Sequence, residues 1–249
     1  MQTLREIHIF FVQNGSISSK REDISFKMTT FNTLLDIRTQ EYIRANDAEI
    51  ISQAITRHKD LMTRIENFRE NNMTETERDE KSVDDILIEI QTNMMTRAFF
   101  RKTTTRQNIG ELTQIEWIKR SIPDIVKLKS DIGGRYLSGG DMYVVESKVK
   151  RQENSTKTFD TYSHETNTYG ILKLTKQAGG AQDNQYNDVK TFIRHIVLYF
   201  EAHPDSTEKY KFYLDGAYYT PNKRNELNSM IPKEHIDRII ITSCESNVI

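Results

Sequence analysis

Apolar residues recur at helical spacing through much of the first part of the chain. After Asn46-Asp47, which has the composition of an N-terminal cap, a stripe of apolar residues predicts helical structure: Ile50, Ile51, Ala54, Ile55, Leu61, Met62, Ile65 and Phe68. Ser82 and Asp85 have capping-box spacing and open a second stripe that includes Ile86 and Ile90. We interpret the acidic stretch 71–81 as a loop, and an apolar run before Asn14-Gly15 suits a hairpin. Residues 1–107 therefore predict a mainly helical N-terminal region.

The remaining residues alternate short β-rich runs with helical patterns. Residues 109–118 predict a helix, and two β-rich runs follow within 123–150. Further strands are expected at 170–176, 211–219 and 236–243, with a long amphipathic helix over 189–200 and a short one at 223–230. The polar stretch 151–168 is expected to be a loop, and 97–106 a strand or a DNA-facing loop. Residues 108–249 thus predict an α/β (α+β) fold with a mixed central sheet flanked by helices, on which the N-terminal region packs.

Acidic and basic residues stand among apolar neighbours between residues 123 and 148. Pro123-Asp124 opens the first run, and Glu146 and Lys148 share one face of the second because strand side chains alternate. An antiparallel pairing centred on Arg135 would place Asp124 opposite Glu146. Two carboxylates beside an amine are suited to holding a divalent cation for phosphodiester cleavage.

Pro123-Asp124 and Glu146-Ser147-Lys148 resemble the two halves of the PD-(D/E)XK nuclease motif. The resemblance is to that superfamily, and especially to its type II restriction endonucleases. It covers the order of elements over about residues 108–244 but few individual positions. A PD-(D/E)XK nuclease-like core with a helical N-terminal extension is the fold that it implies.

The resemblance also implies roles for these residues. Asp124, Glu146 and the backbone carbonyl of Ser147 would hold Mg²⁺, and Lys148 would orient the attacking water or stabilise the transition state. An acid on the preceding helix often joins such a site, and Glu111 and Glu116 are both candidates. Simpler interpretations stay open. Asp124 suits a turn cap, and Glu146 with Lys148 suits an ordinary solvated strand face.

Amide and basic side chains gather around the start of the long amphipathic helix. The predicted DNA-binding residues are Gln182, Asn184, Gln185, Asn187, Lys190 and Arg194. Asn and Gln can pair with adenine, while Lys and Arg contact phosphate or guanine. Asp183, Asn184 and Asn187 are equally typical of a helix cap.

Composition narrows the function classes. The net charge is −1 for the whole chain but −4, +5 and −2 for residues 1–100, 101–200 and 201–249, so positive charge gathers where the candidate chemistry lies. A single cysteine excludes an internal disulfide framework, and the six histidines lack zinc-hydrolase spacing. No membrane span or signal peptide is expected from the sequence, which predicts a cytoplasmic protein.

The resemblance implies a Mg²⁺-dependent type II restriction endonuclease. It would cut double-stranded DNA at a short specific sequence, as a homodimer because a palindrome presents both strands equivalently. The alternatives are a repair, recombination or transposon-end nuclease, or a noncatalytic nucleic-acid-binding module.

Overall fold

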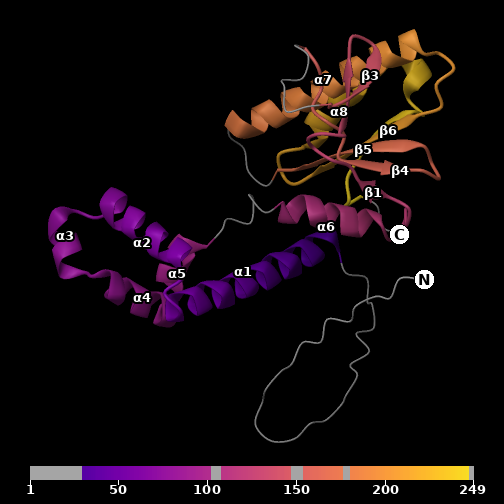
Figure 1. The fold of residues 1–249 in the computed structure, drawn as a ribbon. Coiled ribbons are helices and arrows are strands. Elements are labelled where there is room, and N and C mark those ends of the chain that lie inside the picture. Colours follow the sequence, from indigo (N-terminus) through magenta and orange to yellow (C-terminus); the bar gives the residue numbers. More distant parts are fainter. Residues whose placement is uncertain (1–29, 102–107, 147–153, 176–179, 247–249) are drawn as a thin grey trace, which may run out of the picture.

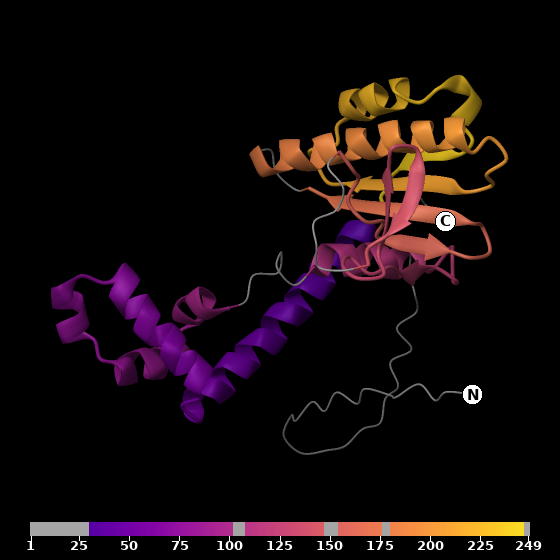
Figure 2. The same ribbon diagram turned by 45° about the horizontal axis from the view of Figure 1, so that its top comes forward.

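The computed structural model describes residues 30–101, 108–146, 154–175 and 180–246, so the hairpin expected near Asn14-Gly15 lies outside these ranges. The fold is mixed α/β: a helical arm leads into a five-stranded sheet that helices cover (Figures 1 and 2). The sequence prediction is confirmed at this level. In the described part of the chain, no helix has the length and apolar character that crossing a bilayer requires.

The order of elements places the helical arm first and the sheet after it. The described helices are α1 (Phe31–Ile55), α2 (Lys59–Asn72), α3 (Glu75–Glu80), α4 (Val83–Thr92), α5 (Met94–Phe100), α6 (Ile109–Ile118), α7 (Gly180–Ala202), α8 (Pro221–Ser229) and the 3-10 helix η2 (Lys233–His235). The strands are β1 (Val126–Lys127), β2 (Arg135–Ser138), β3 (Asp141–Val144), β4 (Thr161–Ser163), β5 (Thr168–Leu174), β6 (Lys209–Asp215) and β7 (Ile239–Thr242). Both views show α2–α5 away from the sheet, at the far end of the long α1.

The sheet is mixed, with strand order β1-β4-β5-β6-β7. The strands β1, β4 and β5 pair antiparallel, whereas β5, β6 and β7 run parallel. The helix α7 makes the crossover between β5 and β6, as parallel neighbours require. The hairpin β2–β3 forms a separate two-stranded sheet.

The central strands carry buried apolar side chains on both faces of the sheet. On β5, Ile171 packs in the core under α7, and the next residue, Leu172, packs with α1 and α6 on the opposite face. Phe212 and Tyr213 on β6 divide in the same way because side chains alternate along a strand. Burial on both faces explains why these strands appear in the sequence as nearly continuous apolar runs.

The arm has an apolar core of its own, and its helix boundaries correct three sequence predictions. Asn46 does not cap a helix, because α1 is continuous from Phe31 and Asn46 is buried within it. Thr74 and Glu77 form a capping box that starts α3 inside the expected loop 71–81. The predicted box at Ser82 is confirmed. The segment 97–106 was expected to be a strand or a loop, but its first residues belong to the helix α5. Residues 102–107 lie outside the described ranges.

The hairpin has a different register from the one expected. Gly139 and Gly140 form its turn with φ of 58° and 89°, values that glycine adopts without a steric penalty. Arg135 pairs with Val144, so the pairing of Asp124 with Glu146 around Arg135 is wrong. The partner of β1 is instead β4, which forms within the stretch 151–168 that was expected to be a loop.

Candidate functional site

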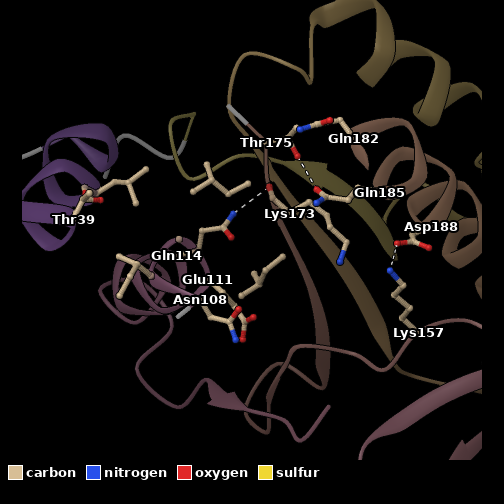
Figure 3. Close-up of a pocket in the computed structure, with 15 residues that line it drawn as sticks. Thr39, Asn108, Glu111, Gln114, Lys157, Lys173, Thr175, Gln182, Gln185 and Asp188 are labelled. Atoms are coloured by element: carbon tan, nitrogen blue, oxygen red, sulfur yellow. Dashed lines mark hydrogen bonds and ion pairs between the residues drawn. The ribbon is translucent and has the colours of Figure 1, made fainter. Parts of the chain in front are cut away.

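A cleft of about 550 Å³ opens between α6 and α7, beside the first turns of α1 (Figure 3). The end of β5, Leu172 to Thr175, lines it together with charged and amide side chains from the helices. Gly110 lets α6 pack closely on β5, since a Cβ added there would lie 2.5 Å from the Leu174 side chain. The next residue on the helix, Glu111, lines the same cleft as Lys173 on β5.

Two carboxylates and two lysines interact with one another near the cleft, and two of the four, Glu111 and Lys173, line it. Glu111 Oε1 lies 2.7 Å from Lys127 Nζ on β1. Asp160 immediately precedes β4, and its Oδ2 accepts a hydrogen bond of 2.7 Å from the N–H of Leu172 on β5. Lys173, Glu111 and Lys127 all act electrostatically on Asp160. The cluster is thus assembled from α6, β1, β4 and β5, elements that are distant in sequence but adjacent in the fold.

Burial makes the charged form of Asp160 unfavourable. Burial raises the pKa of this carboxyl above its ordinary value, and the nearby Glu111 adds to the rise. Lys173, the Leu172 N–H and Lys127 act in the opposite direction but do not cancel the effect of burial. A carboxylate in such surroundings gains from an additional cation.

A buried hydrogen-bond network fixes the floor of the cleft. Gln114, one turn after Glu111 on α6, donates from Nε2 to Asp215 Oδ2 at 2.6 Å and to the Lys173 carbonyl at 3.4 Å. Asp215 Oδ1 accepts from the Cys244 N–H at 2.8 Å, and burial raises the pKa of Asp215. The network ties α6, β5, β6 and the segment after β7 together, so it holds Glu111 and Lys173 at a defined separation.

The structure distinguishes the two acids that the sequence left open on α6. Glu111 lines the cleft, whereas Glu116 makes hydrogen bonds of 2.6 and 2.8 Å to the guanidinium of Arg38 on α1. These bonds lower the pKa of the Glu116 carboxyl. Glu116 therefore joins α6 to α1, and Glu111 is the acid that lines the cleft.

Asp124 lies at the turn between β4 and β5, and its hydrogen bonds are those of a cap. Both of its carboxylate oxygens accept from Ser163 Oγ, at 3.0 and 2.9 Å, and Oδ2 also accepts from the Glu165 N–H at 2.9 Å. The bond from Glu165, followed by those from Ser163 and the His164 N–H, lowers the pKa of Asp124. The structure thus gives Asp124 the capping contacts that the sequence offered as its simpler interpretation.

The remaining residues of the predicted nuclease motif, Glu146, Ser147 and Lys148, come after the hairpin in the sequence. Glu146 is exposed just beyond β3, and no partner strand holds it in register with Asp124. Ser147 and Lys148 lie outside the described residues. Metal binding by Asp124, Glu146 and Ser147, and catalysis by Lys148, stay predictions.

The predicted DNA-binding residues divide between two faces of α7. Gln182 and Gln185 line the cleft. Lys190 instead lies 2.5 Å from Glu226 on α8 and over the Tyr186 ring, so it faces away from the cleft. The side chains of Asn184, Asn187 and Arg194 are exposed.

Sequence reasoning missed Asp160, Lys173 and Lys127. Asp160 falls in the stretch that was expected to be a loop, although Phe159 beside it is fully buried and marks a core position. Lys173 is a lone charge in the apolar run of β5, a signal that could have singled it out. In the described part of the chain, no three His, Cys, Asp or Glu side chains form a group able to hold a metal, so the cluster supplies two carboxylates.

The chain matches no protein-family model, no curated protein and no solved structure.

Proposed function

We propose that the protein is a Mg²⁺-dependent endodeoxyribonuclease with its catalytic centre at Glu111, Asp160 and Lys173. The observation that carries the proposal is that two carboxylates and two lysines from α6, β1, β5 and the residue before β4 interact with one another, with Glu111 and Lys173 lining the cleft. From α6 onward the described elements are a helix, the strands β1–β5, the helix α7, β6, the helices α8 and η2, and β7, which is compatible with the mixed sheet flanked by helices that the nuclease resemblance implies.

The donor set fits Mg²⁺. The ion prefers oxygen ligands and keeps several waters, so two carboxylates beside a phosphate are sufficient. Asp160 has one oxygen oriented by the Leu172 N–H, and burial disfavours its charge, which a divalent cation would offset. When bound, Mg²⁺ would lower the pKa of a coordinated water and neutralise charge on the phosphate.

The protein's own groups supply position and charge. Asp160 is held by the Leu172 N–H, and Glu111 by the packing of α6 on β5. Lys173 brings an ammonium group to the cleft, where it would orient the attacking water or stabilise negative charge on the phosphate. Lys127, already paired with Glu111, would hold that side chain in place or contact the neighbouring phosphate.

A type II restriction activity is the finer proposal. It requires cleavage of both strands of duplex DNA at one short sequence, which a homodimer with one centre in each chain would perform. A repair, recombination or transposon-end nuclease would use the same centre on a different DNA structure. A noncatalytic binding module would bind DNA without cutting it.

Incubating plasmid DNA and labelled oligonucleotides with the protein and Mg²⁺ tests the proposal. Cleavage should require Mg²⁺ and should be lost in Asp160→Asn, Glu111→Gln and Lys173→Met. Binding in Ca²⁺ should persist, because Ca²⁺ favours a looser coordination shell. Sequencing the fragment ends separates a restriction enzyme from the other nucleases.

Glu116→Gln is the matched control, since it makes the same chemical change on the same helix at a residue that pairs with Arg38. Mg²⁺-dependent cutting at the wild-type rate by Asp160→Asn and Glu111→Gln would overturn the assignment of the centre. Binding without cleavage of any DNA by the wild-type chain would favour the noncatalytic module.

A further inference from the structure

The amide of Gln114 is held in one orientation at the floor of the cleft. Its Nε2 donates to three acceptors: Asp215 Oδ2 at 2.6 Å, the Tyr213 carbonyl at 3.3 Å and the Lys173 carbonyl at 3.4 Å. Because all three neighbours are acceptors, the nitrogen must be the atom that faces them, and Oε1 takes the other position. Figure 3 shows this amide between α6 and β5, with its nitrogen toward the strand.

The oxygen of this amide lacks a partner of its own. Only 1% of the Gln114 surface is exposed, yet the residue lines the cleft. In the described part of the chain no donor bonds to Oε1, and this atom is not sealed off from the cleft. An acceptor that is largely buried and has no donor is unfavourable, so this position gains from a ligand that supplies one.

Gln114 adds a third oxygen to the two carboxylates of the proposed centre. Glu111 lies one turn earlier on α6, so the two side chains share one side of the helix, and both line the cleft. Asp160 interacts electrostatically with Glu111, and its Oδ2 is oriented by the Leu172 N–H. Mg²⁺ prefers oxygen ligands and keeps several waters, whose hydrogens a free acceptor can bind. An unpartnered amide oxygen near two carboxylates is therefore suited to the water shell of this ion.

We propose that Gln114 is a positioning residue of the Mg²⁺ site, with Oε1 accepting a hydrogen bond from the water shell of the ion. The inference rests on the proposed nuclease function, which supplies the ion and its two carboxylates. Asp215 acts behind Gln114, because its bond to Nε2 directs Oε1 at the cleft. Outer partners of this kind change metal affinity by about 10- to 100-fold.

Calorimetric titration of the DNA-free protein with MgCl₂ tests the inference. Gln114→Met keeps the length and charge of the side chain but removes the oxygen, so the Kd for Mg²⁺ should rise by about tenfold or more. Gln182→Met is the matched control, because it removes an amide from the α7 side of the same cleft and should leave the Kd unchanged. A purely structural role would lower the melting temperature of Gln114→Met without changing its Kd, and that result would overturn the inference.

Exchanging the two partners separates the oxygen from the buried hydrogen bond. In the double variant Gln114→Glu, Asp215→Asn, the asparagine oxygen can still accept from the Cys244 N–H while its nitrogen donates to the glutamate. The net charge is unchanged, but a carboxylate oxygen now faces the cleft, so the Kd for Mg²⁺ should fall by about tenfold. A Kd equal to that of wild type, or higher, would place the ion out of reach of this position and overturn the inference.

Nuclear magnetic resonance of the wild-type chain supplies a test that does not depend on the folding of a variant. The side-chain amide signal of Gln114 should shift on addition of Mg²⁺, with the midpoint that calorimetry gives, because its oxygen gains a partner. No shift at saturating Mg²⁺ would overturn the inference.

The outcomes for Gln114 and for the nuclease proposal are distinguishable. If the protein cuts DNA but Gln114→Met binds Mg²⁺ as wild type does, the positioning role fails and the nuclease proposal stands. If Mg²⁺ binding depends on Gln114 but no DNA is cut, the ion site stands and the nuclease proposal fails.

Discussion

Asp124 and Asp160 each precede a strand of the same sheet, but their surroundings differ. Asp124 receives hydrogen bonds from Ser163 and from the N–H of Glu165, and these lower its pKa. Asp160 receives one bond, from Leu172, and burial raises its pKa. The protein thus satisfies the charge of Asp124 by itself and leaves that of Asp160 poorly compensated. A carboxylate of the second kind is the better candidate for holding a cation.

The largest difference between the two aspartates is expected in DNA cleavage. Asp160→Asn should lower the rate by about 100-fold or more, because it removes charge from the proposed centre. Asp124→Asn should stay near the wild-type rate, since its contacts are those of a turn cap. Single-turnover cleavage in Mg²⁺ measures both. A loss confined to Asp124→Asn in a folded protein would return the catalytic centre to Asp124.

A second difference is expected in the effect of Mg²⁺ on stability. A ligand that binds only the folded state stabilises it by RT ln(1 + [L]/Kd), about 1.4 kcal/mol at ten times Kd. The wild-type chain and Asp124→Asn should show this gain, and Asp160→Asn should not. Thermal unfolding over a Mg²⁺ titration, with NaCl matched for ionic strength, measures it. An equal gain in all three proteins would place the ion elsewhere.

The sequence revealed elements that carry apolar periodicity. The stripe over 189–200 identified most of α7, and apolar runs identified β5, β6 and β7. The three-residue strand β4 has no such run, because its position depends on pairing with β1 and β5. Short strands of this kind are formed by tertiary contacts that local composition does not record.

Residues of the candidate site could be predicted from the sequence only where they lie on the same helix or strand. Gln182 and Gln185 face the cleft because they share one side of a helix that the sequence identified. Asp160 and Glu111 are 49 positions apart, and their proximity depends on β4 lying between β1 and β5. The glycine turn at Gly139-Gly140 also set a hairpin register that separated Asp124 from Glu146.

The third difference concerns pH, and its sign is opposite for the two aspartates. The pKa of Asp160 is raised by folding, so its contribution is most favourable below the unfolded pKa and is lost as pH rises through the folded pKa. The pKa of Asp124 is lowered, so its contribution is present above the unfolded pKa and is lost as pH falls through the folded pKa. In metal-free buffer, Asp160→Asn should therefore gain stability relative to wild type as pH rises.

Urea unfolding of both variants at about pH 3 and about pH 7 measures this difference. Asp124→Asn should be less stable than wild type at the higher pH and approach it at the lower pH. The same direction of change in both variants would mean that the two carboxyls are in similar environments, and the comparison between them would fail.

The smallest effect on stability is expected at Glu116. Glu116 and Glu111 lie on the same helix, α6, and differ in the same way as the two aspartates: one is satisfied by a partner and the other faces the cleft. Glu116 is satisfied by Arg38, with side chains that are 40% and 42% exposed, whereas Glu111 faces the cleft. An ion pair this exposed contributes about 0.5 kcal/mol, so Glu116→Gln should lower the unfolding free energy by about that amount and leave cleavage unchanged. Glu111→Gln should instead reduce cleavage strongly with little loss of stability, because its ion pair with Lys127 is also partly exposed to solvent. Parallel urea unfolding and cleavage assays separate the two variants. Strong loss of cleavage in Glu116→Gln, at unchanged stability, would make Glu116 the acid of the centre and would remove Glu111 from it.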